Sequence, residues 1–181
     1  MKKCLQKFRF LTLLRISILI VLFNSQAFGQ NLSCLSLQGD TLSIPVEEKA
    51  IVILLSDFRC SACDKFLSEY LAQLNPEIKI YAIARVGVST LQRLAFKKDI
   101  EKKYEIPKDN ICFDLQKKNE KKIVVKRYSD GLFRKLKIQN TPSILLLNKG
   151  KKSLIKYESL FEDVFISESA KIEIQSFFNM N

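Results

Sequence analysis

The sequence has 181 residues, 47% of them hydrophobic and 27% charged, with a formal net charge of +11. This length fits one domain, and the ordinary composition excludes a disordered, collagen-like or multi-span membrane protein. Histidine is absent, which excludes Ser-His-Asp and Cys-His catalysis, zinc sites with histidine ligands and attachment of a c-type haem.

The first 29 residues have the pattern of a secretory signal peptide. Basic residues occupy the first part, positions 16–23 are almost entirely apolar, and Ala27-Phe28-Gly29 supplies the small residues that precede a cleavage site. The alternative is a retained membrane anchor, but the apolar stretch is shorter than the roughly 20 residues that span a bilayer. We therefore expect an exported, periplasmic protein in which residues 1–29 are removed.

Removal of this segment also changes the charge. It holds 5 of the 30 basic residues and none of the 19 acidic ones, so the mature chain carries 25 − 19 = +6. Most of that charge lies between positions 97 and 127, where acidic residues are interspersed. Such a mixed run is typical of a solvated face and does not predict nucleic-acid binding.

The mature chain alternates between strand-like and helix-like patterns. Residues 30–49 read as a lead-in, whose strand is expected at a sheet edge because it contains Pro45. The run 50–55 is continuously apolar and rich in β-branched residues, which predicts a strand covered on both faces. In chain order, the first elements expected are strands at 42–46 and 50–55, a helix from 60 to 74, a strand at 78–86, a helix from 89 to 104 and a strand at 111–113.

The second half continues the alternation and ends in a hairpin and a helix. Asn148-Lys149-Gly150-Lys151 is the hairpin turn, because Gly150 permits a positive φ. The expected elements are a strand at 123–125, a helix at 132–136, strands at 144–147 and 154–157, and one helix from about 159 to 178. This order predicts an α/β fold with a mixed sheet.

The motif Cys60-Ser61-Ala62-Cys63 lies where a buried strand gives way to a helix. At a helix N-terminus the free N–H groups and the macrodipole lower the pKa of a thiol such as Cys60, and Arg59 adds positive charge beside it. Cys63 lies one turn further along the same face, where it can attack a mixed disulfide formed at Cys60. The spacing predicts thiol–disulfide exchange without a cofactor or metal.

Two other uses of these cysteines remain open at this stage. A structural zinc site would need Cys34 and Cys112 as additional ligands, although neither belongs to a second Cys-x-x-Cys motif. An inert Cys60–Cys63 disulfide is the other alternative. Cys34 and Cys112 themselves form either a structural disulfide between the lead-in and the strand at 111–113, or two buried free thiols.

Together, the Cys-x-x-Cys motif after a buried strand and Thr141-Pro142 before an apolar strand and hairpin resemble the thioredoxin fold. With the signal peptide and the long span before Thr141-Pro142, the chain is most similar to the extracytoplasmic thiol–disulfide oxidoreductases of the bacterial envelope, which include the cytochrome c maturation thioredoxins. The resemblance implies a three-layer domain over residues 50–181, with a central mixed sheet flanked by helices.

The resemblance also implies residue roles. Cys60 corresponds to the exposed attacking cysteine and Cys63 to the buried resolving one. Pro142 corresponds to the family's cis-proline, and the backbone of Thr141 to the group that binds an extended substrate. The implied partners are protein thiols and disulfides, with a membrane thiol–electron donor as a further candidate, and the implied direction is reduction.

Three positions depart from the family pattern. Arg59 replaces the usual tryptophan, Ser61-Ala62 lacks a proline, and Leu54 stands where many members carry an acidic or amide residue. The nearest carboxylate before Cys60 in sequence is Asp57, which also stands where a peroxiredoxin-like peroxidase has threonine. These departures bear on reduction potential and rate. The non-enzymatic alternative is a thioredoxin-fold binding module with a non-catalytic disulfide.

Overall fold

A computed structural model describes residues 31–179, apart from position 58, positions 87–88 and the segment 115–130. The expected signal peptide at 1–29 and the expected strand at 123–125 lie outside the described residues. Residues Asn31–Asn181 form one compact unit. Of the helices that the structure describes, none has both the length and the apolar character needed to cross a membrane.

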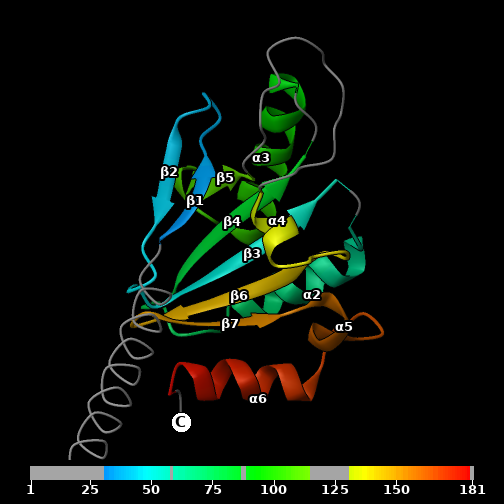
Figure 1. The fold of residues 1–181 in the computed structure, drawn as a ribbon. Helices are drawn as coiled ribbons and strands as arrows, with labels where there is room; N and C mark the ends of the chain where they lie inside the picture. The colour runs from blue at the N-terminus through cyan, green and yellow to red at the C-terminus, as the bar shows by residue number, and fades with distance from the viewer. Residues whose placement is uncertain (1–30, 58, 87–88, 115–130, 180–181) are drawn as a thin grey trace, which may run out of the picture. The chain divides into compact units, whose positions relative to one another are not determined.

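A seven-stranded mixed sheet forms the centre of the fold (Figure 1), in the order β2-β1-β5-β4-β3-β6-β7. Strand β3 runs parallel to β4, and β4 runs parallel to β5, while the other pairs are antiparallel. The strands are β1 (Leu32–Leu35), β2 (Thr41–Ile44), β3 (Ala50–Ser56), β4 (Lys79–Arg85), β5 (Ile111–Phe113), β6 (Ser143–Asn148) and β7 (Lys151–Ile155). Every residue of β3 is buried, as its apolar run predicts.

Alternate residues of β3 pack into two different cores, one on each face of the sheet. Ile51, Ile53 and Leu55 belong to a cluster with the buried sides of α2 (Ser61–Leu71), α3 (Thr90–Tyr104) and α6 (Glu168–Phe177). Ala50, Val52 and Leu54 belong to a second cluster with α4 (Leu132–Lys135) and the β1–β2 hairpin. Because successive strand residues point to opposite faces, this division confirms the predicted three-layer arrangement of a mixed sheet flanked by helices.

The stretch expected as a lead-in belongs to the sheet. Its edge strand is present as β2, and β1 lies between β2 and β5. A disulfide joins Cys34 of β1 to Cys112 of β5, with 5.9 Å between the Cα atoms, and both residues are buried. Of the two states that the sequence leaves open for these cysteines, the structure has the disulfide.

The expected single helix at the C-terminus is wrong. The chain instead forms α5 (Tyr157–Leu160), a hairpin of β8 (Phe161–Glu162) and β9 (Phe165–Ile166), and then α6. Phe161 and Ile166 pair across this hairpin and are both buried, while Asp163 adopts a left-handed φ of 56° at the turn. Ser167 then caps α6 by accepting a hydrogen bond from the backbone N–H of Ala170. The turn escaped prediction because an aspartate, not a glycine, takes the left-handed conformation.

Candidate active site at the Cys60–Cys63 pair

Cys60 and Cys63 are joined in a disulfide at the N-terminus of α2, with 5.2 Å between their Cα atoms. Cys60 is the N-cap residue and has an extended backbone, and its sulfur accepts a hydrogen bond from the backbone N–H of Cys63 at 3.2 Å. A helix N-terminus favours negative charge because its first N–H groups have no partner within the helix. The sulfur of Cys60 therefore lies where a thiolate is stabilised.

The two sulfurs differ in accessibility. Cys60 is partly exposed, whereas Cys63 has no exposed surface. In thiol–disulfide exchange the exposed sulfur meets the partner molecule and the buried one reacts only with its neighbour. The arrangement suits Cys60 for attack on another molecule and Cys63 for resolution.

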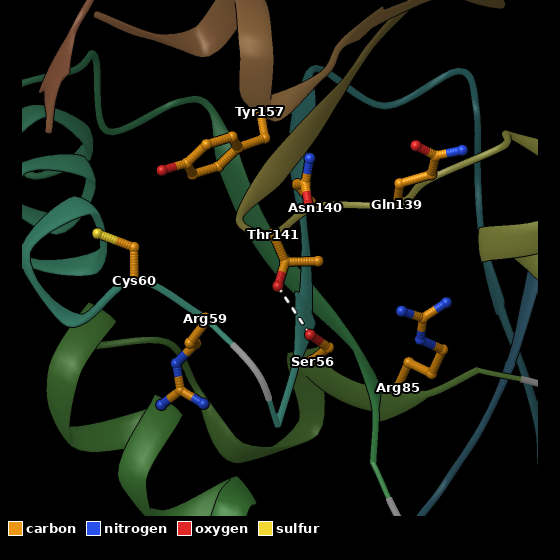
Figure 2. Close-up of a pocket in the computed structure, with 8 residues that line it drawn as sticks. All are labelled: Ser56, Arg59, Cys60, Arg85, Gln139, Asn140, Thr141 and Tyr157. Atoms are coloured by element: carbon orange, nitrogen blue, oxygen red, sulfur yellow. Dashed lines mark hydrogen bonds between the residues drawn. The ribbon is translucent and has the colours of Figure 1, made fainter. Parts of the chain in front are cut away.

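Thr141 and Pro142 lie on the loop before β6, and the peptide bond between them is cis. The loop is attached to the end of β3 by a hydrogen bond of 2.8 Å between the hydroxyls of Thr141 and Ser56. Beside it is a pocket of about 430 Å³ (Figure 2). The pocket is lined by Ser56, Arg59, Cys60, Arg85, Gln139, Asn140, Thr141 and Tyr157. Cys60 and the expected substrate-binding residue Thr141 thus border one cavity.

Tyr157 is a site residue that the sequence did not reveal. Its hydroxyl lies 3.4 Å from the sulfur of Cys63, and its ring packs against Phe161 with 5.2 Å between the ring centroids. Its backbone N–H donates a hydrogen bond to the hydroxyl of Ser143 at 2.9 Å. Tyr157 and Cys63 are 94 residues apart, so no local pattern signals that they meet.

Arg59 is directed away from the cysteine sulfur. Its guanidinium donates hydrogen bonds to Asp64 and Asp99, and it lies 4.5 Å from the centroid of the Phe96 ring. Figure 2 shows the side chains of Arg59 and Cys60 extending in opposite directions. The positive charge of Arg59, expected to lower the pKa of the Cys60 thiol, is thus paired with two carboxylates.

Neither position considered from the sequence supplies a buried carboxylate. Asp57 is exposed, and Leu54 is a fully buried apolar residue of β3. The carboxylate of Asp64, one residue after Cys63, is fully buried and directed towards α3. It accepts hydrogen bonds from Tyr104 at 2.8 Å and Lys103 at 3.3 Å, besides Arg59.

Tyr104 shows the effect of this buried carboxylate. Burial raises the pKa of Tyr104 well above its usual range, and the charge and hydrogen bond of Asp64 raise it further. The hydroxyl therefore stays protonated as a donor to Asp64. The only sequence signal for this cluster is an acidic residue in the first turn of a helix.

Within the described residues there is no group of three or more His, Cys, Asp or Glu side chains that could hold a metal ion. Both cysteine pairs of this part of the chain are in disulfides. The chemistry that the arrangement supports directly is sulfur exchange at Cys60.

Solved structures with a similar fold include two thioredoxin-like proteins. The thioredoxin domain of a thiol-disulfide oxidoreductase from Bacteroides vulgatus aligns with 84% of this chain and 96% of its own, with 19% identity and a TM-score of 0.50. A thioredoxin-like protein from Aeropyrum pernix aligns with 90% of this chain and 97% of its own, with 12% identity and a TM-score of 0.52. No protein-family model and no curated protein sequence matches the chain. The likeness confirms the predicted thioredoxin-like fold.

Proposed function

We propose that this protein is a thiol–disulfide oxidoreductase that exchanges disulfides with protein substrates through Cys60 and Cys63. The observation that carries the proposal is the asymmetric pair at the N-terminus of α2, with Cys60 partly exposed and Cys63 fully buried. An exposed sulfur at a helix N-terminus favours thiolate chemistry, and a second sulfur within bonding reach provides the resolving step.

In the reducing direction, the thiolate of Cys60 attacks one sulfur of a substrate disulfide. A mixed disulfide forms, and the other substrate sulfur leaves as a thiolate that takes up a proton. Cys63 then loses its proton and attacks the sulfur of Cys60, which releases the second substrate thiol. The Cys60–Cys63 disulfide of the structure is the oxidised end state of this cycle, in which two electrons have passed to the substrate.

The pocket beside Cys60 supports a role in substrate binding for Thr141, and we propose that Pro142, the next residue of the same loop, shares it. Thr141 borders the same cavity as Cys60, and its hydrogen bond to Ser56 fixes the loop against the end of β3. We propose that the backbone of Thr141 pairs with an extended segment of the substrate, which places the substrate disulfide over Cys60.

We propose an exported, periplasmic location and a reducing role, with a membrane thiol–electron donor as the source of electrons. The signal-like pattern of residues 1–29 supports export. The Cys34–Cys112 disulfide supports it too, because buried structural disulfides persist mainly in oxidising compartments. Under this proposal residues 1–29 are the signal peptide, and the expected lead-in 30–49 joins residues 50–181 in the thioredoxin-like domain, because β1 and β2 belong to its sheet.

The test is to trap the mixed disulfide. A Cys63→Ser variant, incubated with oxidised protein substrates such as insulin, should accumulate a covalent adduct at Cys60 that reductant dissolves. The matched Cys60→Ser variant should form none. An adduct in neither variant, with biological activity retained in Cys60→Ser, would instead favour a binding module with a non-catalytic disulfide.

A further inference from the structure

We infer that Tyr157 is a further catalytic residue, whose hydroxyl donates a hydrogen bond to the Cys63 sulfur and stabilises its thiolate during the resolving step. The inference rests on the proposed exchange reaction and adds a residue to it. The contact joins the N-terminal end of α5 to the first turn of α2. Its length of 3.4 Å is within hydrogen-bond range for sulfur.

The resolving step poses a physical problem at Cys63. This residue has no exposed surface, and burial disfavours a thiolate because the charge loses its hydration. The strand position where a carboxylate was sought is Leu54, which is apolar and packs into the core on the opposite face of the sheet from Cys63. Among the described side chains, the Tyr157 hydroxyl is the polar group that makes a hydrogen-bond contact with the Cys63 sulfur. A hydroxyl donor can partly replace the lost hydration.

Tyr157 is held in place by the loop that borders the pocket. The Ser143 hydroxyl accepts a hydrogen bond from the backbone N–H of Tyr157 at 2.9 Å and donates one to the carbonyl of Asn140 at 3.0 Å. Asn140 directly precedes Thr141, so the tyrosine backbone is fastened to the proposed substrate-binding loop. Phe161, the first residue of β8, packs against the tyrosine ring. These contacts fix the hydroxyl before the substrate arrives.

The step balances without any further reactant. The Cys63 thiol gives its proton to the substrate thiolate released in the first step, or to solvent. Its electron pair then forms the bond to the Cys60 sulfur, and the bond between Cys60 and the substrate breaks with its electrons moving to the substrate sulfur. Tyr157 keeps its own proton throughout, because it acts as a donor and not as a base.

The expected effect follows from the charge of the acceptor. A hydrogen bond to a thiolate is stronger than one to a neutral thiol, so loss of the hydroxyl disfavours only the reactive form. We expect Tyr157→Phe to slow the resolving step about tenfold at neutral pH and to raise its pH midpoint by about one unit. At a pH above the midpoints of both the wild type and Tyr157→Phe, the resolving rates of the two proteins should converge.

The experiment uses the mature chain, residues 30–181, with the Cys60–Cys63 disulfide reduced and the buried Cys34–Cys112 disulfide intact. The substrate is an aromatic disulfide, 5,5′-dithiobis(2-nitrobenzoate). Attack by Cys60 releases one coloured thiolate, and resolution by Cys63 releases the second, so stopped-flow absorbance separates the two steps. Tyr157→Phe should leave the first phase unchanged and slow the second. Site-specific 3-fluorotyrosine at position 157, whose hydroxyl is a stronger donor, should lower the midpoint instead.

Tyr70→Phe is the matched control. It also removes one tyrosine hydroxyl, on α2, and this hydroxyl is buried without a hydrogen-bond partner in the described part of the chain. A second phase in Tyr157→Phe with wild-type rate and midpoint overturns the inference. An equal slowing in Tyr70→Phe also overturns it, because the effect would then be one of packing. Absence of a second phase in the unsubstituted protein contradicts the proposed function itself, so the two failures are distinguishable.

Discussion

Removal of the Cys34–Cys112 disulfide is expected to destabilise the fold far more than removal of the Cys60–Cys63 disulfide. A cross-link stabilises chiefly by restricting the unfolded chain, and the effect grows with the length of the closed loop. The sequence separations are 78 and 3 residues. Loop-closure entropy then gives about 4.5 kcal/mol for the first cross-link and about 1.6 kcal/mol for the second. The expected difference is therefore about 3 kcal/mol.

The assay is urea unfolding of two double variants, Cys34→Ala with Cys112→Ala and Cys60→Ala with Cys63→Ala, against the oxidised wild type. The Cys34→Ala/Cys112→Ala variant should lose most of its stability and melt on the order of 10 °C below the wild type. It should still carry out thiol–disulfide exchange at Cys60. Equal losses in the two variants would refute the reasoning. So would a first variant that remains folded but no longer exchanges disulfides.

Three further changes test hydrogen bonds and close packing elsewhere in the fold. Asp114→Ala should cost about 1–3 kcal/mol in urea unfolding, because its buried carboxylate accepts hydrogen bonds from two backbone N–H groups at the start of α4. Gly131→Ala should destabilise α4, since a Cβ there would collide with the Asp114 carboxylate. The loss should shrink when Asp114 is already alanine. Glu48→Gln should cost under about 1 kcal/mol at neutral pH. A hydrogen bond from Lys79, and to a smaller extent one from Tyr81, lowers the pKa of Glu48. The stabilisation by ionised Glu48 is therefore fully present above pH 4.5, the ordinary pKa of the carboxyl group, and is lost as the pH falls through the lowered pKa. A Glu48→Gln deficit that persists in acid would contradict the assignment.

The parts of this fold that depend on local sequence patterns could be predicted well. Strand β3 is predicted because six consecutive apolar residues suit a strand with both faces covered, and α2 because its apolar stripe has helical period. The Cys60–Cys63 pair is predicted for the same reason, since its spacing and its place at a helix start are local features. The bounds of α3, Thr90–Tyr104, also agree with the predicted helix from 89 to 104.

The parts that escaped prediction depend on contacts between distant residues. Strand β1 is short, and it is defined by pairing with β2 and β5 and by the Cys34–Cys112 disulfide. The direction of Arg59 depends on Asp99, 40 residues away. Tyr157 was expected at the end of a strand but begins a helical turn, and only the folded chain brings its hydroxyl to Cys63.

The most direct test of the central claim is a redox titration of the Cys60–Cys63 pair in glutathione and dithiothreitol buffers, read by alkylation and mass spectrometry. We expect a reversible two-electron couple with a midpoint near or below about −230 mV, in the range of thioredoxin and the glutaredoxins. A midpoint near about −120 mV would mark an oxidant and reverse the proposed direction of electron flow. A pair with no reversible couple in these buffers would contradict the oxidoreductase proposal.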